Sequence, residues 1–250
     1  MLRALFLLLT LLSTLPADAT GRRIRGIGRG IGHQEPQWTP RRLNAPLWFR
    51  ADLGITLNGA TVSAWTNQGT DAAGSLTQAT ADKQPTYVAV STLGGRVALS
   101  FDAADDILTG ASVNLAQPNF IAASFQSPVN SAGINRSLLS GTVPEYVFVG
   151  DAVLKVYCGA TATIAAIANG TNGAVQIRVN GAASASRLSG AAWITGQNVG
   201  ASALQALYIG GPLVAGWNGL VGEVIVLGTM PSAAVEDRIH AYMRVRYGLW

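Results

Sequence analysis

Cysteine is nearly absent from this sequence, because Cys158 is the only one among 250 residues. A single cysteine excludes an intrachain disulfide and a zinc site built on several thiolates. Cys158 lies in the apolar segment VLKVYCGA. Free cysteines in such segments are commonly buried, so we expect an inert thiol at this position.

Charged side chains are scarce as well, at 12% of the residues. Soluble domains usually carry about 25%, so the surface must be built from small and uncharged polar residues, as is typical of bacterial and viral surface proteins. Residues 20–46 hold six arginines against Glu35, whereas residues 47–250 hold ten basic and eleven acidic side chains. The basic character therefore belongs to a leader. The nearly neutral remainder is not a basic nucleic-acid reader of the usual kind.

Long hydrophobic runs are missing, since the apolar run near the N-terminus, residues 4–15, has only 12 residues. A membrane-spanning helix needs roughly 20. The run follows Arg3 and precedes Pro16, and Ala17 and Ala19 supply the small residues of a signal-peptidase site. Residues 1–19 therefore predict a secretory signal. If they are retained instead, they would be buried between subunits of an assembly.

Residues 20–44 form a leader rich in glycine and arginine, which cannot nucleate a helix cheaply. It is either a solvated flexible segment or an assembly arm that orders against an anionic or subunit surface. The arm would act through Arg22, Arg23, Arg25 and Arg29. No aromatic residue lies among them to stack on bases, which argues against single-stranded nucleic acid.

Residues 45–250 read as one all-β domain, with short apolar segments separated by turn residues every 8–12 positions. In the segment VQIRVNG, residues 175, 177 and 179 point inward, and Asn180-Gly181 predicts a hairpin turn. One helix is expected after Ser232, with Gly248 as its stop. It should pack against the edge or underside of a β-sandwich.

The domain resembles the bacterial and phage branch of the concanavalin A-like, laminin-G-like jelly rolls. The matching segments, in order along the chain, are PLWFRADLGITL, VSAWTNQG, LTQATADKQPTYV, GGRVALSFDAADDIL, SLLSG, VQIRVNG, LYIGG, WNGLVGEVIVLGTMPS and AYMRVRYG. The resemblance implies an antiparallel jelly-roll β-sandwich with one short C-terminal helix. Val235 stands where the acid of a capping box would be, so the helix should begin loosely.

The acidic stretch SFDAADDILTG contains Asp102, Asp105 and Asp106. Crowded carboxylates are the ligands that calcium prefers, and laminin-G-like relatives sometimes bind it. The same residues also suit a strand–turn–strand, in which aspartates cap turn amides without a metal. Both interpretations stay open at this point.

Catalysis finds little support in the sequence. Neither His33 nor His240 lies near a nucleophile motif, and none of the four glutamates has another acid two residues away, as in glucanases that share the resembled fold. Glu223 is expected to be structural, paired with an arginine or with backbone groups. These observations predict that the chain is not an enzyme. The alternative is a secreted glycoside hydrolase that depends on Glu223.

Three tryptophans in loop-like contexts could offer an aromatic surface to a sugar ring. Trp193 and Trp217 are the candidate ligand-binding residues, with Trp38 as a third, whereas Trp48 and Trp65 are expected in the core. The predicted function is a non-catalytic, surface-displayed module for adhesion, glycan binding or structural decoration. It would be secreted or part of a phage virion, with no cofactor unless calcium binds. Its partner would be a glycan, a cell-surface ligand, neighbouring virion subunits or a second copy.

Overall fold

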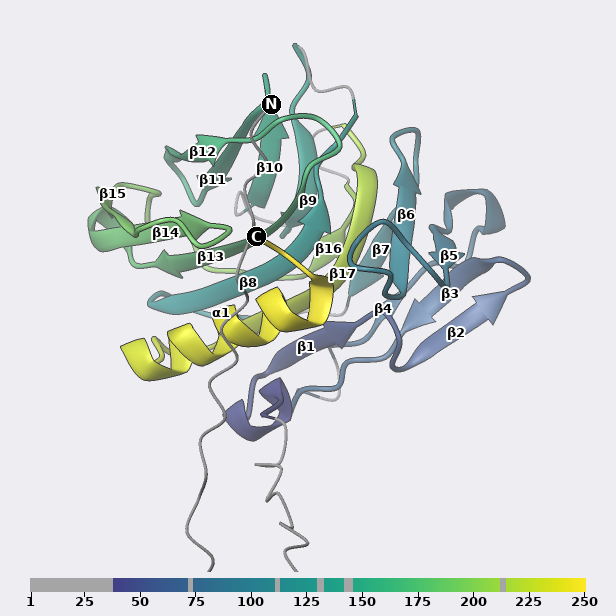
Figure 1. Cartoon of the computed structure of the whole chain (residues 1–250), viewed down its shortest axis with the longest axis horizontal. Coiled ribbons are helices and arrows are strands. Elements are labelled where there is room, and N and C mark those ends of the chain that lie inside the picture. The colour runs from purple at the N-terminus through teal and green to yellow at the C-terminus, as the bar shows by residue number, and fades with distance from the viewer. Residues whose placement is uncertain (1–37, 72–73, 111–112, 130–132, 142–145, 212–214) are drawn as a thin grey trace, which may run out of the picture. The chain divides into compact units, whose positions relative to one another are not determined.

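A computed structural model describes residues 38–71, 74–110, 113–129, 133–141, 146–211 and 215–250 (Figure 1). Residues Gln37–Trp250 form one compact unit, distinct from Met1–Pro36. The predicted signal segment and the arginines of the predicted assembly arm lie outside the described residues. No helix in the described part of the chain is long and apolar enough to cross a membrane.

The compact unit is built from antiparallel strands and a single α-helix. The strands are β1 (Leu47–Arg50), β2 (Ile55–Asn58), β3 (Thr61–Trp65), β4 (Leu76–Thr77), β5 (Thr86–Val88), β6 (Ala98–Asp102), β7 (Leu108–Gly110), β8 (Asn119–Gln126), β9 (Arg136–Ser140), β10 (Tyr146–Gly150), β11 (Val153–Tyr157), β12 (Thr161–Ala166), β13 (Asn172–Val179), β14 (Ser184–Leu188), β15 (Ile194–Gln197), β16 (Tyr208–Ile209) and β17 (Asn218–Leu227). The helices are η1 (Pro40–Leu43), η3 (Ala81–Lys83), η4 (Gly181–Ala183) and α1 (Ala233–Tyr247).

The strands form two layers. In the first layer, β17 pairs with β8 on one side and with both β1 and β6 on the other, and the sheet continues through β13, β14 and β15. In the second layer the order is β4, β7, β16, β9, β10, β11, β12. β3 pairs with β4 of the second layer and with β5 of the first layer. It therefore joins the two layers along one side. This arrangement confirms the predicted jelly-roll β-sandwich.

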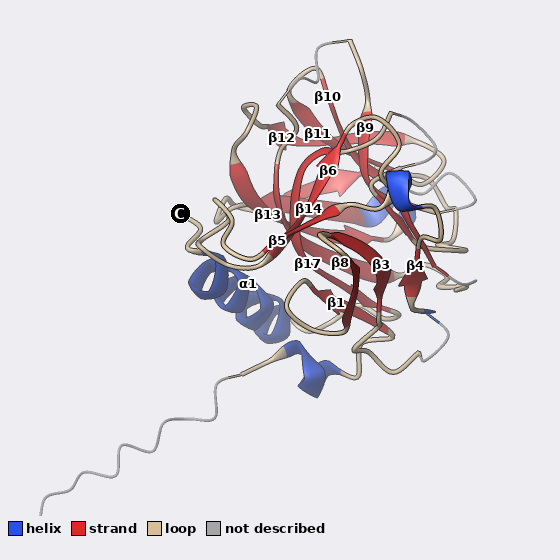
Figure 2. Cartoon of the chain, turned by 90° about the vertical axis from the view of Figure 1, so that its right-hand side faces the viewer, coloured by secondary structure: helices blue, strands red, loops and turns tan. Residues whose placement is uncertain are grey.

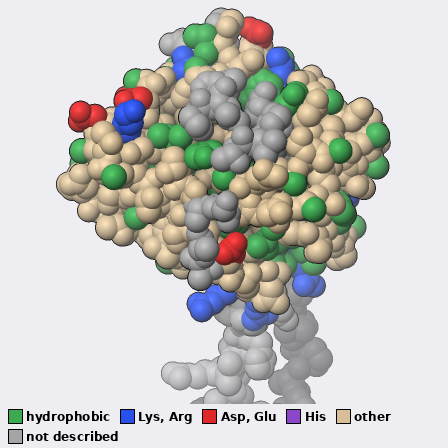
Figure 3. Space-filling view, turned by 180° about the vertical axis from the view of Figure 1, so that it is seen from behind, with side chains coloured by type: hydrophobic (Ala, Val, Ile, Leu, Met, Phe, Trp, Pro, Cys, Tyr) green, Lys and Arg blue, Asp and Glu red, His purple; other side chains and the backbone are tan. Residues whose placement is uncertain are grey.

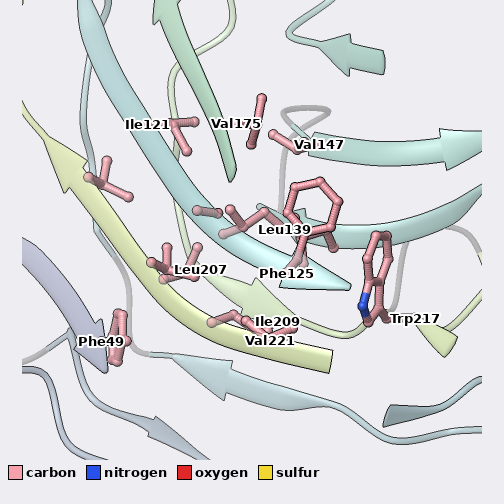
Figure 4. Packing of buried hydrophobic residues seen from close by; sticks show 14 of the residues in the cluster. Phe49, Ile121, Phe125, Leu139, Val147, Val175, Leu207, Ile209, Trp217 and Val221 are labelled. Atoms are coloured by element: carbon pink, nitrogen blue, oxygen red, sulfur yellow. The ribbon is translucent and has the colours of Figure 1, made fainter. Parts of the chain in front are cut away.

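The main hydrophobic core lies between the layers (Figure 4). Because side chains alternate along a strand, every second residue of β13 faces this core, namely Val175, Ile177 and Val179, as predicted. Cys158 is fully buried in the same cluster, which confirms the expected inert environment. Trp65 is also fully buried there.

A second hydrophobic cluster fills the space between the outer face of the first layer and α1, which lies across β8 and β13 (Figure 1). The helix contributes Ile239, Met243 and Tyr247, and the sheet contributes Trp48 and Phe120, among others. β17 is therefore covered on both faces, which explains the apolar residues on both faces of its last four positions, Val224–Leu227. The prediction that the helix packs on the sandwich is confirmed.

The ends of α1 follow the predicted signals. Ser232 occupies the N-cap position but makes no side-chain capping bond, as expected from the missing capping-box acid. Gly248 ends the helix with a φ of 59°, and its backbone N–H donates to the carbonyl of Arg244. The helix is therefore anchored by its buried face more than by its first turn.

Two hairpins can be compared with the sequence. β10 and β11 meet at Asp151 and Ala152, which have φ values of 53° and 57°. β13 and β14 also form a hairpin, but η4 lengthens the connection beyond the two-residue Asn180-Gly181 turn that the sequence suggested. Seen from behind, the surface carries few charged side chains, in keeping with the composition (Figure 3).

Candidate functional site

Asp102, Asp105 and Asp106 lie at a corner where the chain leaves one layer and enters the other. β6 ends at Asp102 and pairs with β5 and β17, whereas β7 begins at Leu108 and pairs with β4 and β16. Ala103 makes the turn with a φ of 73°. The strand–turn–strand prediction is confirmed, and the structure adds that the two strands belong to different sheets.

The three carboxylates of this corner do not share one environment. Asp106 is only 7% exposed, and its Oδ2 accepts a hydrogen bond from the backbone N–H of Asp102 at 3.0 Å. Oδ1 of Asp102 accepts from the N–H of Ala104 at 2.8 Å, while Asp102 and Asp105 themselves are exposed. Two of the aspartates therefore cap turn amides, which is the chemistry expected of this residue type in tight turns.

Burial, together with the nearby negative charges of Asp102 and Asp105, raises the pKa of Asp106 to about 6. The hydrogen bond from the Asp102 backbone acts in the opposite direction. Asp106 therefore exchanges a proton close to neutral pH. It can donate a hydrogen bond when protonated and accept one when ionised.

A pocket of about 240 Å³ opens beside this corner. Its lining combines acidic, basic, apolar and glycine residues: Lys83, Ala104, Asp105, Asp106, Ile107, Gly210, Gly211 and Gly216. Sequence reasoning found the aspartates but not the other side of the pocket. The glycine pair of the LYIGG segment was the available signal, and it was assigned to the fold alone.

The backbone conformation and the close packing at Gly210 require glycine on this side of the pocket. Gly210 has a φ of 94°, and a Cβ there would lie 2.4 Å from the ring of Phe101. Its carbonyl accepts from the backbone N–H of Trp217 at 2.8 Å, while the carbonyl of Trp217 accepts from the N–H of Ala103. The glycine loop and the acidic corner are thus bonded to each other. They form one preformed polar pocket.

Calcium at this corner stays a prediction. Among the described residues, no group of three or more His, Cys, Asp or Glu side chains could hold a metal ion. Asp106 is buried, whereas Asp102 and Asp105 are exposed, so the three carboxylates differ in accessibility.

Glu223 is a second acidic centre, fully buried between β17 and α1. Its carboxylate accepts hydrogen bonds from Trp48 Nε1 at 2.6 Å, from the Tyr242 hydroxyl at 3.1 Å and from the Tyr247 hydroxyl at 3.0 Å. Arg246 Nε lies 3.7 Å away. Burial raises the pKa of Glu223 to about 7, against the hydrogen bond of Trp48 and the charge of Arg246. This agrees with the predicted structural role and removes Glu223 from contact with a substrate.

The predicted aromatic ligand residues separate into two cases. Trp217 is completely buried and packs edge to face on Phe125 at 5.8 Å, so the expectation of an exposed ring is wrong for it. The sequence around Trp217 resembles a loop, but the residue lies at the start of β17, and its ring points into the core (Figure 4). Trp193 is half-buried, with the guanidinium groups of Arg178 and Arg187 at 4.0 and 4.6 Å from its ring centre. Ligand binding by Trp193 stays a prediction.

Within the described residues, His240 and the terminal Trp250 form no catalytic arrangement. His240 is half-buried, accepts a hydrogen bond from the N–H of Gly190 and stacks on Trp250 at 4.8 Å. Burial lowers its pKa, together with the nearby charge of Arg187. His240 therefore lies at the rim of the helix, in contact with the C-terminal residue. His33 lies outside the described residues.

Comparison with known proteins rests on structure alone. No family model matches the sequence, and no curated protein matches it. Domain 4 of AbnA, a GH43 extracellular arabinanase from Geobacillus stearothermophilus solved with arabinotriose, matches with a TM-score of 0.55 and 9% identity. The match covers 80% of this chain and 98% of that one.

Two glycoside-hydrolase chains also match. A Trypanosoma rangeli sialidase in complex with sialic acid has a TM-score of 0.52 and 11% identity, covering 80% of this chain. A GH54 α-L-arabinofuranosidase has a TM-score of 0.57 and 12% identity, covering 75% of this chain. This chain spans about a third of the length of the sialidase, 33%, and about half of the arabinofuranosidase, 51%.

These matches overturn the sequence-based prediction that the chain is not an enzyme. That prediction rested on the absence of one glucanase motif, yet chains that contain this sandwich include a sialidase and an arabinofuranosidase. At 9–12% identity the likeness shows the fold. The chain has an antiparallel jelly-roll β-sandwich fold like that of these domains.

Proposed function

We propose that this chain is an extracellular glycan-binding jelly-roll domain that holds a sugar unit in the pocket at the acidic corner. The observation that carries the proposal is the pairing of Asp105 and Asp106 with a preformed glycine loop around about 240 Å³. Pockets for drug-sized ligands measure about 300–1,000 Å³. The smaller volume here suits one sugar unit of a longer chain.

The chemistry of the lining supports a sugar. Exposed and buried carboxylates accept hydrogen bonds from hydroxyl groups, Lys83 donates them, and Ile107 offers an apolar contact to a ring. The similar domain of an arabinanase was solved with arabinotriose. That similarity supports the ligand class but does not identify the sugar.

Binding can be tested by calorimetry with arabino-oligosaccharides and a panel of other neutral oligosaccharides. Asp105→Asn/Asp106→Asn should weaken binding at least tenfold, because the change replaces the two carboxylates of the pocket lining that would accept hydrogen bonds from sugar hydroxyl groups. Asp237→Asn on α1 is a matched control, since it also removes a surface carboxylate but lies outside the pocket lining. Equal affinities in the wild type and the double variant would place the ligand elsewhere.

Glycoside hydrolysis at the same pocket is the second candidate. A glycosidase uses one protonated and one ionised carboxyl group, and Asp106, with its pKa raised to about 6, lies beside Asp102 and Asp105. Such an enzyme would lose activity in Asp106→Asn, and its rate would fall as pH rises through about 6 because the acid form is needed. Glu223→Gln should retain activity, since Glu223 is fully buried. An active Asp106→Asn variant would contradict this candidate.

The mode of display is also proposed rather than established. We infer either a secreted adhesion module or a decoration protein of a phage particle, docked through the basic leader. Intact-mass analysis of the natural protein separates the two cases. A mass that begins at Thr20 indicates secretion, whereas a particle-bound protein that keeps residues 1–19 indicates the virion.

A further inference from the structure

The surface formed by η1 and the outer side of α1 is both basic and apolar, and it shares no lining residue with the acidic-corner pocket. Figure 2 shows α1 with η1 beside it, near the point where the described chain begins. We call this surface the η1–α1 face, and its members are Trp38, Arg41, Arg42, Arg238, Ala241, Tyr242, Arg244 and Val245.

The arginines of the η1–α1 face are exposed and uncompensated. Among the described residues, neither Arg41, Arg42, Arg238 nor Arg244 takes part in an ion pair, although five ion pairs occur elsewhere. The acid on the exposed side of α1, Asp237, is already paired with Arg187 at 3.1 Å. Within the described residues, the η1–α1 face therefore carries a net positive charge.

Apolar groups lie among these arginines. Val245 is 72% exposed, and Trp38 packs edge to face on Tyr242 with 5.7 Å between ring centres. Trp38, Ala241, Tyr242 and Val245, with Arg238, line a mainly apolar pocket of about 260 Å³. Most of the Val245 side chain is therefore open to solvent beside an aromatic pair.

Two further pockets flank η1, each of about 260 Å³. Arg41 lines one of them and Arg42 lines the other. An apolar pocket thus lies near two polar pockets that each carry a guanidinium group. Guanidinium groups bind phosphate oxygens in bidentate geometry, and tryptophan and tyrosine favour the boundary between headgroups and acyl chains.

We propose that the η1–α1 face docks onto the surface of an anionic phospholipid bilayer. Arg41, Arg42 and Arg238 contact headgroup phosphates, while Trp38 and Val245 enter the boundary of the acyl chains. The observation that selects a bilayer over a soluble polyanion is the exposed apolar group among the arginines, because a purely ionic partner gains nothing from Val245. The protein lies on such a surface and does not cross it.

The test is co-sedimentation of the full chain with vesicles of phosphatidylglycerol and phosphatidylcholine, compared with phosphatidylcholine alone. Each arginine near an anionic surface contributes about 1 kcal/mol, so Arg41→Ala/Arg42→Ala should bind the anionic vesicles roughly 10- to 30-fold more weakly. Val245→Ser should weaken binding about threefold. Arg96→Ala/Lys155→Ala is the matched control, because it removes two positive charges outside both this face and the acidic-corner pocket, and it should bind like the wild type.

The leader must be tested in the same assay, because its arginines also attract anionic surfaces. If binding is lost only when Arg22, Arg23, Arg25 and Arg29 are replaced by alanine, and the face variants bind normally, the proposal is wrong. Equal affinity for heparin, with Val245→Ser indistinguishable from the wild type, would identify a soluble polyanion as the partner and also overturn it. All changed residues of the face are exposed, and matching melting temperatures confirm that the variants are folded.

Discussion

Glu223 should make the stability of this domain depend on pH in a way that one substitution removes. The carboxyl group is fully buried, and burial raises its pKa from 4.5 to about 7 despite its hydrogen bonds. The native state therefore holds this proton more tightly than the unfolded chain does. Stability from this group is complete below pH 4.5 and is lost as pH rises from 4.5 through 7. Glu223→Gln cannot ionise and lacks this dependence.

The magnitude follows from the two pKa values. At about 1.4 kcal/mol for each pH unit, a change from 4.5 to about 7 corresponds to about 3 kcal/mol. Between pH 5 and pH 8, roughly 2.5 kcal/mol of that should be lost by the wild type. The free energy of unfolding of the wild type, minus that of Glu223→Gln, should fall by the same amount over this range. Other titrating groups are present in both proteins and cancel in the difference.

Urea denaturation at pH 5, 6, 7 and 8, followed by the fluorescence of the six tryptophans, measures this difference. A difference that stays constant with pH would show that Glu223 has an ordinary pKa in the native state. A difference that rises with pH would show that the carboxylate is held ionised by Arg246. Either result would refute the argument from burial.

The remaining predictions concern packing, a buried ion pair and the pocket loop. Trp217→Ala should lower the free energy of unfolding by about 3–5 kcal/mol in urea titrations, since the whole side chain is buried; a loss below 1 kcal/mol would contradict this burial. Arg178→Ala removes two hydrogen bonds from the buried carboxylate of Glu236 and should cost about 3 kcal/mol, whereas the double change with Glu236→Gln should cost less. Gly210→Ala should lower the melting temperature far more than Gly59→Ala, because both have positive φ but only the former meets neighbouring atoms; equal shifts would argue against a tight loop.

The fold was predictable because its signals are local and repeated. Alternation along β13 and the Gly248 helix stop each follow from short-range physics. The aspartate corner was predictable as a turn for the same reason. Its pairing partners were not, because strand pairing across the two layers depends on contacts far apart in the sequence.

The candidate site was only half predictable. The pocket needs Asp106 and Gly210, about a hundred residues apart, and nothing local signals that they meet. Trp217 shows the converse error, since a glycine-rich context suggested a loop while the residue precedes a central strand. The absence of a glucanase motif likewise excluded one arrangement of carboxylates and not the reaction class.

The position of β17 determines when this domain can fold. It pairs with β1, β6 and β8, so it completes the middle of the first layer, yet it is the last strand in the chain. Until residue 227 is available, β1 lacks the partner that it has among the described strands, and β6 and β8 lack a neighbour on one side. Such long-range pairing slows folding, and the first layer cannot be completed before β17 has been synthesised. A nascent chain that stops before β17 would therefore leave strand edges of the first layer unpaired, and unpaired edges are the sites at which β-proteins aggregate.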